Sequence, residues 1–146
     1  MNPAIKTIYE SNSWDDFEKK INKFRTDNNQ LYADCFEWFC IFFLQIHPVY
    51  RSCYKNFLHR DEFMNSYEIK KKLGLQYYEM KEQGIDGILE TYANKLVAIQ
   101  CKYKEKKDKN LNAEDLNDIL RVVNGKNARK NVEMILMCSN TKGITN

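Results

Sequence analysis

The chain has 146 residues, of which 43% are hydrophobic and 13% aromatic, and its formal net charge is +3. This length and composition fit one globular domain with a single core and exclude an intrinsically disordered chain. The charge is too mild to indicate a nucleic-acid-binding protein by itself.

Two features bear on where the protein works. The opening residues, "MNPAIKTIYESNSW", contain no apolar segment of the kind found in a secretory signal. The most hydrophobic run, "CFEWFCIFFLQI", is too short to cross a bilayer and contains Glu37. We therefore expect a soluble, cytoplasmic protein with no membrane partner.

The cysteines are odd in number and include no CxxC pair, and the two histidines are not spaced to complete a zinc site. Several lie in apolar runs, where a free cysteine behaves as a small hydrophobic residue. The sequence thus predicts a reducing compartment, no disulfides and no structural zinc. The five are Cys35, Cys40, Cys53, Cys101 and Cys138.

The first part of the chain predicts two helices. Residues 13–24 have Ser13 as a helix N-cap and apolar residues at helical spacing. Residues 31–46 are apolar on nearly all sides, which is typical of a buried helix. This second helix carries Glu37 into or beside the core, so its carboxylate must be protonated, paired, or facing a cation.

The remaining elements are predicted in the following order. Pro48 ends the second helix, and a strand over 49–57 and a short helix over 61–72 follow. A hairpin over 84–91 and 95–104 comes next, then a helix that begins at Asn112. The apolar run 132–140 predicts a strand buried on both faces.

This order of helices and strands indicates an α/β or α+β fold with a mixed sheet. We expect a single domain over 1–146, with 1–30 as an N-terminal helical extension and 31–146 as the core.

The hairpin suggests a site. If its strands pair so that Asp86 lies opposite Gln100 and Lys102, the Asp86 carboxylate and the Gln100 amide oxygen reach one divalent cation, since paired strands lie about 4.8 Å apart. The main-chain carbonyl of Cys101 is a candidate third ligand. Such oxygen ligands suit Mg²⁺ or Mn²⁺, and Lys102 beside the ion would offset the charge of a phosphodiester during hydrolysis.

The alternative is that these are ordinary polar residues on a solvated sheet face. Gly84 and Gly87 flank Asp86, and glycine in a strand often marks a bulge or the close approach of a ligand, which favours the site. Downstream, Lys104, Lys106 and Lys107 belong to a basic cluster that we expect to bind the DNA backbone, although a solvated loop would show the same pattern.

The segments "GID" and "AIQCKYK" resemble the catalytic core of PD-(D/E)xK nucleases, in the Mrr-like branch where Gln replaces the middle acid. The chain also resembles the N-terminal nuclease domain of type ISP restriction enzymes and related plasmid or viral helicase–nuclease fusions. The matching segments are "CFEWF", "HPVYR", "KKLGLQYYEMKEQGIDGI", "VAIQCKYK", "LNAEDLNDIL" and "MILMCSNT".

The resemblance implies a restriction-endonuclease-like mixed sheet flanked by helices and Mg²⁺-dependent (or Mn²⁺-dependent) cleavage of DNA. It implies that Asp86 is the main metal-binding acid, Gln100 the second ligand, Lys102 the catalytic lysine, and Glu37 an outer-shell acid. Glu82 stands where the family often has an aspartate.

The resemblance further implies a helicase or translocase domain in the same polypeptide and a viral or plasmid origin, and it leaves homodimerisation open. The competing interpretations are an inactive nuclease-fold module that binds DNA or docks a partner, and a nuclease that acts on RNA.

Overall fold

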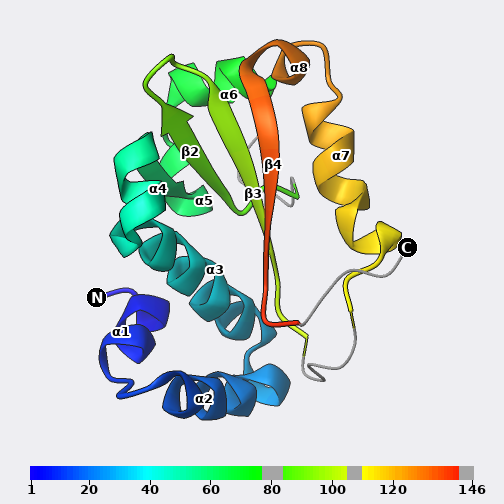
Figure 1. Ribbon diagram of the computed structural model, residues 1–146. Helices are drawn as coiled ribbons and strands as arrows, with labels where there is room; N and C mark the ends of the chain where they lie inside the picture. The colour runs from blue at the N-terminus through cyan, green and yellow to red at the C-terminus, as the bar shows by residue number, and fades with distance from the viewer. Residues whose placement is uncertain (77–83, 105–109, 142–146) are drawn as a thin grey trace.

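The structure is a computed structural model that describes residues 1–76, 84–104 and 110–141 (Figure 1). Its helices are α1 (Pro3–Tyr9), α2 (Trp14–Asp27), α3 (Asn29–Ile46), α4 (Pro48–Cys53), α5 (Arg60–Phe63), α6 (Tyr67–Leu73), η1 (Ala113–Leu116), α7 (Asn117–Val123) and α8 (Ala128–Asn131). Its strands are β1 (Tyr54–His59), β2 (Gly87–Thr91), β3 (Leu96–Lys102) and β4 (Val132–Ser139).

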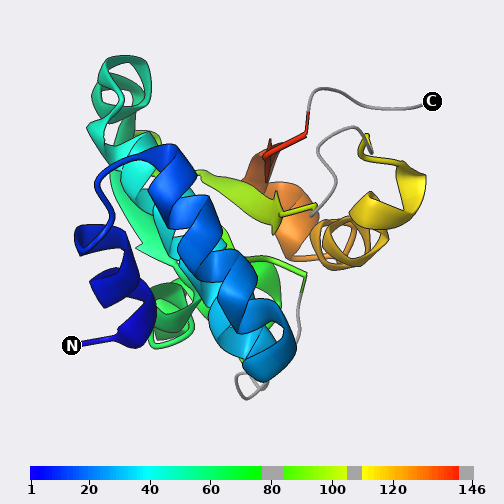
Figure 2. The ribbon, with the colours of Figure 1, turned by 90° about the horizontal axis from the view of Figure 1, so that it is seen from below.

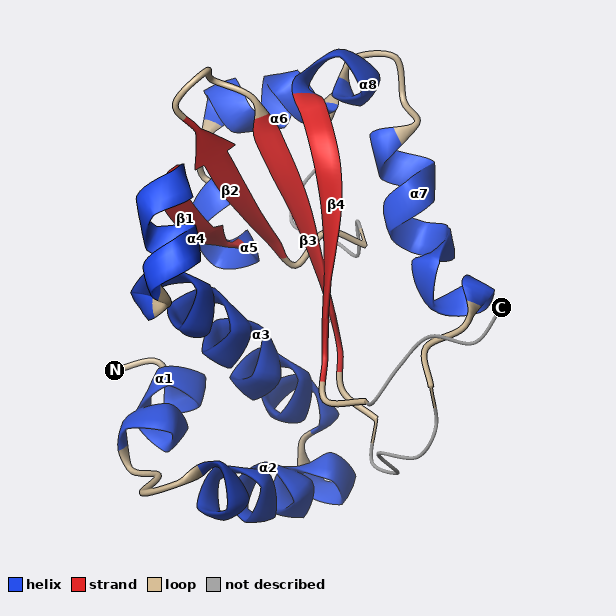
Figure 3. Ribbon diagram, in the orientation of Figure 1, coloured by secondary structure: helices blue, strands red, loops and turns tan. Residues whose placement is uncertain are grey.

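The four strands form one sheet in the order β1-β2-β3-β4. The pairs β1–β2 and β2–β3 are antiparallel, whereas β3 and β4 run parallel. The sheet is therefore mixed and helices flank it, which confirms the predicted fold class (Figure 3).

Alternation along β3 divides the core between the two faces of the sheet. Val97 and Ile99 pack with Ile41 and Leu44 of α3, whereas Ala98 packs with residues of α5, α6 and α7. Figure 2 shows α3 and α7 on opposite sides of β3. Helices α1 and α2 cover the other side of α3 through a further apolar cluster.

The two glycines around Asp86 are explained by the close approach of helices. A Cβ on Gly87 would collide with Cδ1 of Ile41 in α3. Gly84 has a φ of +73°, and a Cβ there would lie 2.7 Å from the main-chain carbon of Asp118 in α7. Helix packing, rather than a bulge or a ligand, thus accounts for these glycines.

Several predicted elements are confirmed. Ser13 caps α2 through the N–H of Asp16, α3 spans the apolar run, and the hairpin strands pair as expected. Asn112 caps the turn that leads into α7, although that turn is a 3-10 helix.

Two predicted elements are wrong in part. Residues 48–53 form α4 rather than the start of a strand, because His47 caps the Val49 N–H and Pro48 suits a first helical turn. Strand β4 is half-buried and partly exposed rather than buried on both faces, because it pairs with β3 alone at the sheet edge. The short helices α1 and α8 were not predicted.

Among the described residues, none of the helices has the length and apolar character needed to cross a membrane.

Candidate active site around Asp86 and Glu37

Asp86 lies where the pairing of β2 with β3 ends. The last paired residues are Gly87 and Ile99, yet β3 continues to Lys102 beside β4. The N–H of Asp86 donates to the carbonyl of Ile99 at 2.8 Å, and its Oδ2 accepts the N–H of Cys101 at 2.8 Å. A side-chain carboxylate thus occupies the gap that opens between the strands and is fixed to the β3 backbone.

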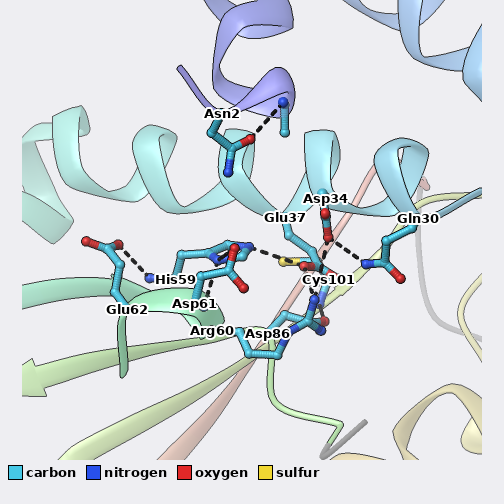
Figure 4. A network of polar contacts seen from close by, with 11 residues as sticks. Asn2, Gln30, Asp34, Glu37, His59, Arg60, Asp61, Glu62, Asp86 and Cys101 are labelled. Atoms are coloured by element: carbon cyan, nitrogen blue, oxygen red, sulfur yellow. Dashed lines mark hydrogen bonds and ion pairs between the residues drawn. The ribbon is translucent and has the colours of Figure 1, made fainter. Parts of the chain in front are cut away.

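Arg60 connects this carboxylate to α3. Its Nη1 lies 3.4 Å from Oδ1 of Asp86, and its Nη2 lies 3.2 Å from Oε2 of Glu37 and 3.5 Å from Oδ1 of Asp34. Figure 4 shows the three acidic side chains gathered around the Arg60 guanidinium. The N–H of Arg60 also donates to the Asp86 carbonyl at 2.9 Å, which fixes the start of α5 against Asp86.

His59 forms a hydrogen bond with Glu37 and stacks on the ring of Trp38. The two rings stack with centroids 4.0 Å apart, and His59 is fully buried. Its Nδ1 accepts the N–H of Asp61 at 3.0 Å, so in the neutral ring the proton lies on Nε2, which donates to Oε2 of Glu37 at 3.3 Å. Burial lowers the pKa of His59 and thereby favours this neutral form.

Both carboxyl groups have raised pKa values, chiefly because they are removed from water. Burial, together with the neighbouring Glu37 charge, raises the pKa of Asp86 to about 7. Burial likewise raises the pKa of Glu37 to about 7, against the opposing charge of Arg60. The two side chains also lie within hydrogen-bonding reach of each other. The prediction that Glu37 lies in or beside the core is confirmed, and of the alternatives that the sequence left open the structure shows it paired with Arg60.

Gln100 and Lys102 do not join the network around Arg60. Gln100 is buried, and its Oε1 has no hydrogen-bond partner among the described residues. Continuing the β2–β3 pairing by one step would place Gln100 opposite Asp86. Alternation along β3, however, directs Gln100 and Lys102 to the face that α7 covers, and Lys102 lies close enough to Asp115 to lower its pKa.

The structure therefore brings Asp86 and Glu37 together. Within the described ranges, no hydrogen bond or ion pair joins Gln100 or Lys102 to either carboxylate. The Cys101 main chain contacts Asp86 through its N–H, whereas the sequence had suggested its carbonyl as a metal ligand.

Of the three lysines predicted to bind DNA, one forms an ion pair within the protein and two lie outside the described residues. Lys104 forms an ion pair with Asp115 at 2.9 Å, and its N–H donates to Oδ1 of Asn140 at 2.7 Å. Lys106, Lys107 and Glu82 lie outside the described residues.

Three members of this network were missed from the sequence. Asp34 stands three residues before Glu37, so helical spacing on α3 gave a signal that both share a face. His59 ends β1 and Arg60 follows it, in a stretch whose pattern indicated no site, and only the pairing of β1 with β2 brings them to Asp86.

Asp86 and Glu37 present oxygen donors of the kind that a hard divalent cation takes. Both carboxyl groups have raised pKa values, and Arg60 forms an ion pair with each of them. The Gln100 amide oxygen has no partner in the described part of the chain, but its side chain is directed to the other face of the sheet.

Comparisons of the chain with protein-family models, with curated proteins and with solved structures found no match.

Proposed function

We propose that this protein is a Mg²⁺-dependent DNA endonuclease domain that hydrolyses phosphodiester bonds at Asp86. The observation that supports it most is the pair of carboxylates, the buried Glu37 and the partly buried Asp86, at the point where β2 and β3 separate. A protein gains little stability from two such acids with raised pKa values, so their position at a strand opening favours a functional role.

Asp86 and Glu37 would hold the metal, without Gln100, whose side chain alternation along β3 directs to the α7 face. When bound, Mg²⁺ (or Mn²⁺) would offset the negative charge that grows on the phosphate oxygens. Asp86 is suited to this task because the Cys101 N–H and the β1–β2 pairing fix its carboxylate before any ligand arrives.

Lys102 would orient the attacking water or neutralise the phosphate. It is half-buried and forms no ion pair with another described residue, so its ammonium group is available to an anion. Because the Lys102 side chain lies on the α7 face at the end of β3, it would have to extend around the end of the sheet to reach the scissile phosphate.

A second candidate is a nuclease-fold module that binds DNA or docks a partner without cleaving. The position of Arg60 favours it, because the guanidinium already forms ion pairs with Asp34, Glu37 and Asp86. In that case the network is a structural ion cluster that joins α3 to β2.

Cleavage assays with matched variants separate the two. Purified protein is incubated with plasmid DNA and with RNA, in Mg²⁺ or Mn²⁺, alongside Asp86→Asn, Lys102→Ala and the control Asp118→Asn. Asp118 is exposed and its carboxylate lies outside the network. We expect wild type and Asp118→Asn to nick DNA, and the other two variants to lose nicking while they retain the wild-type circular dichroism spectrum.

Retained nicking in both Asp86→Asn and Lys102→Ala would overturn the assignment. DNA binding without nicking by the wild type, over a range of both metals, supports the module. Preferential cleavage of RNA would transfer the same chemistry to an RNA substrate.

A further inference from the structure

Three cysteines that are far apart in the sequence converge behind Asp86. They are Cys40 of α3, Cys101 of β3 and Cys138 of β4, and their sulfur atoms all lie within 4.8 Å of one another. Cys101 and Cys138 are direct partners in the parallel pairing of β3 and β4, and Cys40 meets them from the helix that covers this face. No motif in the sequence links them.

The geometry suits one thiophilic metal ion. Three thiolates bound at about 2.3 Å to a tetrahedral zinc ion lie roughly 3.8 Å from each other, which is within the observed spread of the three sulfurs. Thiolates select soft ions, so this group differs in kind from the oxygen ligands at Asp86 and Glu37.

A groove gives access to the cluster. It has a volume of about 480 Å³, and both Cys40 and Cys138 line it together with aromatic and aliphatic side chains of α3 and β4. Three protein ligands leave one tetrahedral position, and this groove lets water or a small ligand fill it. Catalytic zinc sites likewise have three protein ligands and one open position, whereas structural zinc sites have four protein ligands.

The three sulfur atoms lie close enough to shift one another's pKa values. Hydrogen bonds from the Cys101 and Cys40 thiols lower the pKa of Cys138 well below its usual range. A hydrogen bond with Cys101 lowers the pKa of Cys40, but its hydrogen bond with Cys138, burial and the charge of Asp86 raise that pKa overall. Hydrogen bonds with Cys138 and Cys40, burial and the charge of Asp86 raise the pKa of Cys101. A bound dication would favour deprotonation of all three thiols, because metal-bound cysteines are thiolates.

We propose that Cys40, Cys101 and Cys138 form a second metal site, which binds one thiophilic ion such as Zn²⁺ with three sulfur ligands and one open position. The site is independent of the nuclease proposal. Its neighbour is nonetheless Asp86, because Cys101 contributes its side chain to the sulfur cluster and its N–H to the Asp86 carboxylate.

The test uses the reduced, metal-free full chain. Co²⁺ is added as a spectroscopic probe, and its thiolate-to-metal charge-transfer absorption is followed; Zn²⁺ is then titrated in competition with a chelator. We expect one Co²⁺ per chain, with an absorption intensity typical of three thiolates, and its displacement by one Zn²⁺. Zn²⁺ should also raise Tm, because a ligand that binds only the folded state stabilises it.

The variants are Cys101→Ser and Cys138→Ser, with Cys35→Ser and Cys53→Ser as controls. Cys35 is a buried cysteine in another cluster, and Cys53 is exposed. Loss of a ligand should weaken Zn²⁺ binding by more than about 100-fold, because loss of an outer-shell partner alone costs about 10- to 100-fold. The controls should bind as the wild type does. Cys138 lies on the partly exposed strand β4, so Cys138→Ser can test the site if Cys101→Ser does not fold.

Absence of the charge-transfer absorption in the reduced wild type would overturn the proposal. So would equal binding by Cys138→Ser and Cys35→Ser. A disulfide between Cys101 and Cys138 in air-oxidised protein, found by peptide mapping together with no Zn²⁺ binding after reduction, would assign the cluster to thiol oxidation instead.

Discussion

Asp86 and Glu37 share one guanidinium, since the two terminal nitrogens of Arg60 lie 3.4 Å and 3.2 Å from their carboxylate oxygens. Glu37 is buried and Asp86 is partly buried, and both acids have raised pKa values. Part of the stability of this protein therefore depends on the guanidinium that lies between the two carboxylates.

The first prediction concerns pH. Asp86 and Glu37 have pKa values of about 7 in the folded protein, against ordinary values of 3.8 and 4.5. Their contribution to stability is complete when the pH is below the ordinary pKa values, and it is lost as the pH rises through about 7. The free energy of unfolding should therefore fall by on the order of a few kcal/mol between these pH values. Urea denaturation from about pH 5 to about pH 8 measures it.

The variant Glu37→Gln isolates this effect. His59 acts with the opposite sign, because burial lowers its pKa and its contribution is lost as the pH falls. Arg60, Asp34 and Asp61 also lie near the Asp86–Glu37 pair. These three residues and His59 are unchanged in the variant, so their effects cancel in the comparison. Glu37→Gln should make the pH dependence shallower; an unchanged slope would show that the two carboxylates do not titrate as described.

The second prediction concerns Arg60→Ala. Removal of the guanidinium leaves the buried Glu37 and the partly buried Asp86 without their positive partner, and the variant should lose about 3 kcal/mol or more at pH 8. The control is Arg121→Ala, whose ion pair with Asp118 is exposed and should contribute less than about 1 kcal/mol.

The same variant reports on the metal. If the acids bind Mg²⁺ or Mn²⁺, either ion should raise the Tm of Arg60→Ala more than that of the wild type, because Arg60 no longer competes for the carboxylates. An equal response of the two proteins to either metal would argue for a purely structural ion cluster.

The third prediction concerns the glycines. Gly87→Ala should cost about 1–3 kcal/mol because its Cβ collides with Cδ1 of Ile41. Ile41→Val removes that atom, so the double variant should be more stable than the sum of the single effects predicts. Gly84→Ala should not be rescued in this way, since its Cβ meets the main chain of α7 and its φ is positive. Urea denaturation of the single and double variants checks both statements.

The fourth prediction concerns DNA affinity. Combined Lys106→Ala and Lys107→Ala should weaken binding to duplex DNA and reduce the slope of log K against log salt by about 0.9 per lost phosphate contact. The matched control is Lys19→Ala, an exposed lysine of α2. Lys104→Ala should have a smaller effect, because Asp115 already competes for its ammonium group. Equal loss in the Lys19 control would point to nonspecific attraction by overall charge.

The sequence by itself determined the local elements and one part of the site. Helical periodicity and the Ser13 cap gave α2, the apolar run gave α3, and alternation gave β3, because each of these patterns is read over a few neighbouring residues. The same patterns showed that Glu37 is buried and needs a partner, since a charge inside an apolar helix is visible from its surroundings along the chain.

Tertiary structure alone decided which groups meet. The partner of Glu37 is Arg60, which reaches it through the pairing of β1 with β2, and the three cysteines converge only because α3 packs on β3 and β4. The α3 contacts of Ile99 likewise direct Gln100 and Lys102 to the other face of the sheet. Such contacts depend on which face of a strand meets which helix, and that choice arises from packing over the whole domain, which no local pattern encodes.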